Sequence, residues 1–120
     1  MEACDRLGYK YGLGIGYTPA SFYLGQQRKL KRDGGGYWPS WADNIIPDLQ
    51  SMGCVTNIET DSASQFVVGT LHGMRMGTIV SVISNRVLDR WGDNGGEEKA
   101  CRAATEAVYI LKQWEKEGIF

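Results

Sequence analysis

The sequence predicts an α/β fold in which helices pack on a mixed or parallel sheet. Strand signals and helix signals alternate along the chain. Residues 77–84 form a β-branched run that is almost continuously apolar, as expected of a strand buried on both faces. Residues 97–116 carry apolar side chains at helical intervals, with Gly95 and Gly96 before them and Gly118 after them. The 120 residues suffice for one compact domain with a hydrophobic core.

Glycine and proline separate the first elements. Residues 9–18 alternate larger side chains with glycine and end at Pro19, which predicts a strand that another element can approach closely. Residues 22–30 could form a second short extended piece. The basic run and triple glycine of residues 29–36 are typical of a solvated loop.

The middle of the chain predicts a helix, a strand and a second helix. Residues 39–52 have helical spacing interrupted by Pro47, which predicts a short, broken helix. Residues 55–59 could form a brief strand, and residues 61–74 a helix. The apolar stripe expected to face the core from that second helix comprises Ala63, Phe66, Val67, Thr70 and Leu71.

Composition narrows the classes of partner and compartment. The 13 basic and 14 acidic side chains give a net charge of -1, so we expect neither nucleic acid nor a membrane as partner, and small neutral ligands fit better. Cys4, Cys54 and Cys101 are widely spaced and form no metal-ligand pattern, so we expect reduced thiols, no metal and a cytoplasmic protein. The N-terminal residues lack the apolar core of a signal peptide.

Gln26 and Arg28 are the first candidates for ligand contact. An amide and a guanidinium two residues apart, beside the aromatic Phe22, can read the edge of a planar heterocycle. On an extended piece both side chains face the same way. The alternative is that both are exposed polar residues on a loop.

Two further groups of polar residues follow predicted strands. Glu59 and Asp61 could accept hydrogen bonds from vicinal sugar hydroxyls, although Asp61 or Thr60 could equally be an ordinary helix N-cap. Residues 83–86, Ile-Ser-Asn-Arg, lie just past the end of the apolar run, where ligands of open α/β sheets usually bind. The alternative for them is a strand-exit turn.

Two other features of the sequence are weaker indications of function. The glycines at positions 12, 14 and 16 do not have the spacing of a dinucleotide-binding loop. The single histidine, His72, falls at the end of a predicted helix, which favours capping or packing over catalysis.

In order along the chain, these segments resemble the nucleoside phosphorylase family and its uridine phosphorylase branch. Phe-Tyr-x-Gly-Gln-x-Arg at positions 22–28 matches the uracil-recognition stretch of that branch. Glu-Thr-Asp-Ser-Ala at positions 59–63 is similar to the family's Glu-Met-Glu-Ser-Ala ribose segment, and positions 82–86 resemble its apolar strand ending in Asn-Arg. The similarity extends from about Gly8 to the final helix.

The resemblance implies a reaction and a role for each candidate. It implies phosphorolysis of uridine to uracil and ribose 1-phosphate, with phosphate as co-substrate and no other cofactor. The catalytic residues would be Gln26 and Arg28, which would bind the uracil edge, and Arg86, which would support the base-binding loop. The other substrate-binding residues implied are Phe22 on the base, and Glu59, Thr60, Asp61, Ile83 and Ser84.

The resemblance also implies a fold and an assembly. The chain would be the C-terminal part, residues 1–120, of a phosphorylase/hydrolase-like three-layer fold with a central mixed sheet, without the family's N-terminal half that holds phosphate. Family members are hexamers, so a homo-oligomer is expected. Thr60 and Asp61 depart from the methionine and glutamate of the family.

Two other functions stay open at this point. A purine nucleoside phosphorylase or nucleosidase would carry an aspartate where this chain has Asn85, which cannot act as an acid. A non-catalytic nucleoside-binding or assembly fragment would bind uridine without turnover.

Overall fold

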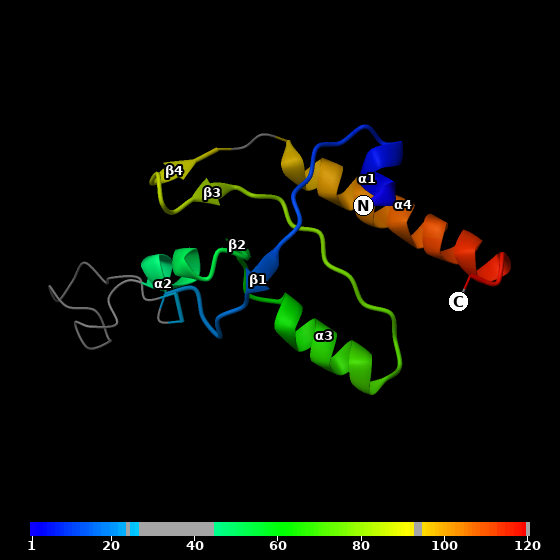
Figure 1. The fold of residues 1–120 in the computed structure, drawn as a ribbon, viewed down its shortest axis with the longest axis horizontal. Helices are drawn as coiled ribbons and strands as arrows, with labels where there is room; N and C mark the ends of the chain where they lie inside the picture. Colours follow the sequence, from blue (N-terminus) through cyan, green and yellow to red (C-terminus); the bar gives the residue numbers. More distant parts are fainter. Residues whose placement is uncertain (24, 27–44, 93–94, 120) are drawn as a thin grey trace, which may run out of the picture. The chain divides into compact units, whose positions relative to one another are not determined.

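The computed structural model describes residues 1–23, 25–26, 45–92 and 95–119 (Figure 1). The chain divides into two compact units. One unit comprises Leu13–Met76, and the other combines Met1–Gly12 with Gly77–Phe120. Helices and short strands alternate along the chain, which confirms the α/β class.

In the unit that contains both ends of the described chain, helix α1 (Glu2–Arg6) packs against helix α4 (Gly96–Lys116), as Figure 1 shows. Arg6 Nη1 lies 3.3 Å from a carboxylate oxygen of Glu106. Among the described residues of this unit, the buried apolar side chains are Ala3, Ala103 and Ile110.

The long C-terminal helix was predicted correctly. Glu97 and Glu98 stand in its first turn and Lys116 in its last, so these charges oppose the helix dipole at both ends. Its Glu98–Arg102 pair, 2.7 Å apart, adds an exposed contact between successive turns.

Strands β3 (Ser84–Asn85) and β4 (Arg90–Trp91) form an antiparallel hairpin in the same unit. The Asn85 side-chain oxygen accepts hydrogen bonds from the backbone N–H groups of Val87 and Leu88, each 3.0 Å away. This side-chain turn starts the connection, and Asp89 completes it at a φ of 48°. The strand-exit turn considered from the sequence is therefore present.

The predicted buried strand over residues 77–84 is wrong. Residues 77–83 have no regular structure, and Ile79, Val82 and Ile83 are 42%, 61% and 46% exposed. A strand requires a partner that accepts its backbone hydrogen bonds, and among the described residues the only strand at this place is the two-residue β3, paired with β4. Sequence pattern alone cannot show that a partner is present.

In the other unit, strands β1 (Ile15–Tyr17) and β2 (Val55–Ile58) form a parallel pair. The strand predicted over residues 9–18 is shorter than expected, since β1 covers its last part only. The expected close approach occurs at Gly14, where an added Cβ would stand 2.2 Å from the Thr56 side chain. The strand predicted over residues 55–59 is confirmed as β2.

The two helices of this unit differ in part from expectation. Helix α2 (Ile45–Ser51) is not broken at Pro47, because this proline lies in the first turn, where a missing N–H is tolerated. Residues 27–44 lie outside the described residues, and they include much of the predicted second extended piece, the basic loop and the start of the helix predicted over residues 39–52.

Helix α3 (Ser62–Leu71) forms as predicted, but its apolar stripe does not face a core. Phe66, Val67 and Leu71 are 38%, 61% and 80% exposed, whereas the buried residues are Ser62 and Gly69. Amphipathic spacing indicates a face that can be buried, and burial also requires a second layer opposite that face.

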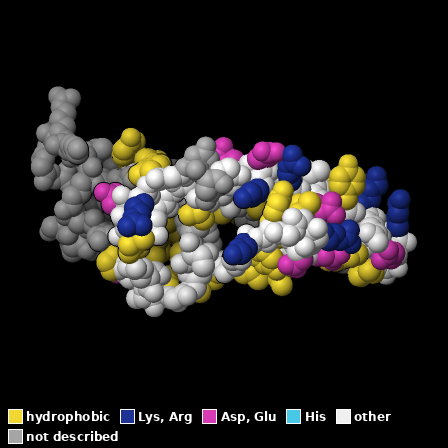
Figure 2. All heavy atoms as spheres, turned by 90° about the horizontal axis from the view of Figure 1, so that it is seen from above, with side chains coloured by type: hydrophobic (Ala, Val, Ile, Leu, Met, Phe, Trp, Pro, Cys, Tyr) yellow, Lys and Arg dark blue, Asp and Glu magenta, His cyan; other side chains and the backbone are white. Residues whose placement is uncertain are grey.

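The central mixed sheet expected from the sequence is not formed by the described strands, which make two separate sheets of two strands each. Many large apolar side chains are consequently exposed, and Figure 2 shows them in yellow among charged ones on the face it draws. The three-layer arrangement stays a prediction.

Candidate functional site

The candidate site lies at the carboxyl ends of β1 and β2. Because the two strands are parallel, the residues that follow them, Thr18 and Glu59, emerge at the same edge. The backbone continues this pairing by one step, since the N–H of Glu59 donates to the carbonyl of Tyr17 over 3.1 Å. Two residues 41 positions apart in sequence thus become neighbours.

The Glu59 carboxylate is the centre of a hydrogen-bond network. One oxygen, Oε1, accepts a hydrogen bond from the Thr18 hydroxyl. The other, Oε2, accepts from the backbone N–H groups of Asp61 and Ser62, each at 2.7 Å. These are the unpaired N–H groups at the start of α3, so Glu59 caps this helix.

These contacts change the acidity of Glu59. Its partial burial opposes ionisation, but the hydrogen bonds from Thr18, Ser62 and Asp61 outweigh that effect and lower its pKa from 4.5 to about 2. The residue is therefore an anion at any pH near neutrality. Its main acceptor positions are used within the chain.

Asp61 and Thr60 are placed differently from Glu59. Both are exposed at the start of α3. Asp61 occupies the N-cap position, yet its side chain makes no capping hydrogen bond. The cap predicted for Asp61 or Thr60 is thus supplied by Glu59, and the Asp61 carboxylate stands at the helix start without a capping task.

The loop that carries Gln26 is tied to the end of β1. The Tyr17 hydroxyl donates to the carbonyl of Gly25 over 3.1 Å, and the N–H of Gly25 donates to Ser21 Oγ over 2.8 Å. A Cβ at Gly25 would lie 2.9 Å from backbone atoms of Ser21, so only glycine fits this closed loop. Gln26 is 4% exposed, and the alternative of an exposed loop residue is wrong for it.

The other residues predicted to bind the base are Phe22 and Arg28. Phe22 is 44% exposed and meets Tyr23 edge-on, with ring centroids 5.2 Å apart. Arg28 lies outside the described residues. Ligand contact by Phe22, Gln26 and Arg28 stays a prediction.

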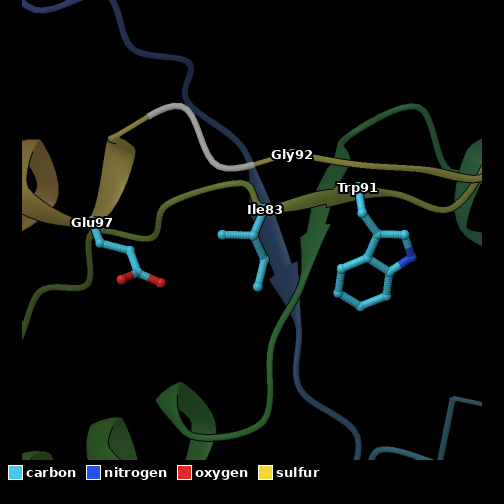
Figure 3. Close-up of a pocket in the computed structure, with 4 residues that line it drawn as sticks. All are labelled: Ile83, Trp91, Gly92 and Glu97. Atoms are coloured by element: carbon cyan, nitrogen blue, oxygen red, sulfur yellow. The ribbon is translucent and has the colours of Figure 1, made fainter.

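The other candidates, Ile83, Ser84 and Arg86, belong to the other unit. Ser84 pairs with Trp91 in the hairpin, and Arg86 begins its turn half-buried. Ile83 lines an open hollow of about 440 Å³ together with Trp91, Gly92 and Glu97 (Figure 3). This hollow is formed within one unit.

Sequence reasoning missed three residues that organise the site: Tyr17, Thr18 and Ser21. Each holds a candidate ligand residue or its loop by a side-chain hydrogen bond. A usable signal is their position, since Tyr17 and Thr18 end the predicted strand before Pro19 and Ser21 lies two residues after this proline, just ahead of the predicted base-binding stretch.

In the described parts of the chain, no three His, Cys, Asp or Glu side chains come together as a group that could hold a metal ion. Within the same residues, none of the helices has the length and apolar character needed to span a bilayer. The three cysteine thiols form no disulfide.

Comparison with known proteins identifies a relative of this chain. It is 39% identical over 117 residues to a uridine phosphorylase from Thermococcus kodakarensis, an alignment that covers 98% of this chain and 40% of that relative. No family profile and no solved structure matches the chain. The resemblance to the uridine phosphorylase branch of the nucleoside phosphorylases is therefore confirmed, for a chain that spans two-fifths of the length of its relative.

Proposed function

We propose that this chain carries the uracil-binding and ribose-binding residues of a uridine phosphorylase and acts in the phosphorolysis of uridine. The observation that carries the proposal is the edge formed by β1 and β2, where the Gln26 loop and the Glu59–Asp61 segment are both anchored. The sequence relationship to a uridine phosphorylase supports the same activity. The proposed fold is the three-layer phosphorylase arrangement.

Base recognition would rest on Gln26 and Arg28. In phosphorolysis, an oxygen of phosphate forms a bond to the anomeric carbon of ribose while the bond from that carbon to uracil breaks, and uracil leaves with the bonding electrons. Donors aimed at the uracil oxygens would stabilise this negative charge more in the transition state than in the substrate. Phe22 would pack on the ring, and Arg86 would support the base-binding loop.

Ribose recognition would rest on Asp61. Its carboxylate is exposed and has no capping hydrogen bond, so it can accept from a pair of sugar hydroxyls. Glu59 would contribute through its hold on the start of α3, and Thr60 would lie beneath the sugar. Ile83 and Ser84 are proposed as further substrate-binding residues.

Phosphate as co-substrate and assembly as a homo-oligomer belong to the proposal as well. The exposed apolar residues of α3 and of residues 79–83 favour burial against further polypeptide. We propose a cytoplasmic enzyme, in keeping with three cysteines that are not paired in disulfides.

A second candidate is a nucleoside-binding module without turnover. This candidate retains the base and ribose contacts and differs only in the absence of phosphate-dependent cleavage. The purine-selective alternative is disfavoured because Asn85 uses its side-chain oxygen within the hairpin turn.

The test is release of uracil from uridine by the purified chain, with and without phosphate, beside a uridine binding titration. Phosphate-dependent release is expected of the enzyme. Saturable binding without release would favour the second candidate. If neither uridine nor uracil binds, both candidates fail. Inosine, tested in parallel, reports on purine selectivity.

A further inference from the structure

Two adjacent residues at the end of β1 hold the two halves of the candidate site. Tyr17 ties the loop of Gln26 through the Gly25 carbonyl, while Thr18 ties the Glu59 carboxylate. Adjacent side chains on an extended backbone point to opposite sides, so one strand end can serve two separate loops. Thr18 was not among the residues predicted to bind ligand.

The Thr18 contact acts on a carboxylate that is already engaged elsewhere. Glu59 Oε2 accepts from the N–H groups of Asp61 and Ser62, the Ser62 side chain also hydrogen-bonds this carboxylate, and Oε1 accepts from the Thr18 hydroxyl. A carboxylate held at one oxygen alone can rotate about its side-chain bonds. Held at both oxygens, it keeps one orientation, and the N–H groups bound to it keep theirs.

We infer that Thr18 is a positioning residue of the ribose site, which fixes Glu59 so that the first turn of α3 presents the Asp61 carboxylate in one direction. The ribose assignment rests on the proposed function, whereas the positioning of α3 does not. The effect of Thr18 would reach the substrate through Glu59 and then through the backbone of Asp61.

The test uses three variants of the full chain. Thr18→Val removes the hydroxyl at nearly constant volume, and Thr18→Ser restores a hydroxyl. Thr56→Val is the matched control, because Thr56 lies on the neighbouring strand β2 and its hydroxyl faces Asn57 and not Glu59. Circular dichroism melting establishes that each variant is folded.

The first readout is nuclear magnetic resonance of the Glu59 carboxyl carbon and of the Asp61 and Ser62 amides. Thr18→Val is expected to raise the pKa of Glu59 from about 2 toward 4.5 and to speed amide exchange at Ser62 by about tenfold. Thr18→Ser and Thr56→Val should leave both values near those of the original chain. An unchanged Glu59 pKa in Thr18→Val overturns the inference.

The second readout compares uridine with uracil. Thr18→Val should weaken uridine binding by about tenfold and leave uracil binding unchanged, because uracil lacks the sugar that Asp61 would hold. Equal loss for both ligands would mean a general structural role and would overturn the ribose assignment. If the original chain binds neither ligand, the proposed function fails, and the carboxyl titration alone decides whether Thr18 positions α3.

Discussion

The Thr18 hydroxyl and the Glu59 carboxylate meet at the carboxyl ends of two parallel strands, and the hydrogen bond between them joins segments 41 residues apart in sequence. Glu59 in turn caps α3. This carboxylate is therefore a structural anion, and the carboxylate that remains available to a ligand is that of Asp61. The two acidic residues of the segment therefore differ in their contacts within the chain.

Replacing Asp61 by asparagine is expected to weaken uridine binding by about tenfold, because a neutral amide accepts hydrogen bonds from sugar hydroxyls less strongly than a carboxylate. Uracil affinity should stay unchanged. The melting temperature should shift little, since the Asp61 side chain makes no capping hydrogen bond. Calorimetric titration with both ligands checks this, with Asp48→Asn in α2 as the control. Weaker binding of uracil as well would argue against a ribose contact.

Gln26 should be tested by a replacement that preserves volume. Because Gln26 is 4% exposed, alanine would leave a cavity and destabilise the loop, whereas methionine retains the length of the side chain and removes its hydrogen-bonding groups. Gln26→Met is expected to weaken both uracil and uridine binding at least about tenfold. Gln50→Met on the exposed surface of α2 is the matched control. Unchanged uracil affinity in Gln26→Met would remove Gln26 from the base site.

The lowered pKa of Glu59 predicts a stability that depends on pH. Its folded-state pKa of about 2 lies below the unfolded value near 4.5, so the stabilisation is present above pH 4.5 and is lost as the pH falls toward 2. Glu59→Gln should lower the free energy of unfolding by about 1 kcal/mol at pH 6, after allowance for solvent screening, and by almost nothing at pH 2.

Urea unfolding of both proteins at several pH values measures this difference. Glu117→Gln, at an exposed residue that follows α4, is the control and should change stability little at any pH. A difference between Glu59→Gln and the original chain that stayed constant from pH 6 to pH 2 would contradict the titration of Glu59 as its cause.

Local features of the fold were predictable, whereas long-range pairing was not. The span of α4 follows from apolar periodicity and terminal charges, and the close packing at Gly14 follows from the absence of a side chain. The buried strand over residues 77–84 failed because apolar character predicts a need for a partner and not its presence. The prediction that the apolar stripe of α3 faces a core failed for the same reason.

The candidate site shows the same difference between local features and long-range contacts. Gln26, Glu59 and Asp61 were singled out by residue type and spacing, and their contact with a ligand stays a prediction. The capping role of Glu59 was not evident, since it depends on Thr18, which is remote in sequence. A contact across parallel strands requires their register, and the sequence of one chain does not specify that register.

The exposed apolar segment 79–83 predicts self-association. Ile79, Val80 and Val82 are 42%, 40% and 61% exposed, and the Ser81 hydroxyl is buried without a hydrogen-bond partner among the described residues. An extended β-branched segment outside any sheet can pair with another strand and bury these side chains. Val82→Lys places a charge in that segment. It is expected to lower the apparent molar mass in light scattering at about 100 μM chain, without lowering the melting temperature of dilute protein.

Val87→Lys is the matched control, at a residue in the hairpin turn that is 59% exposed. An equal effect of both variants would assign the association to net charge instead of strand pairing.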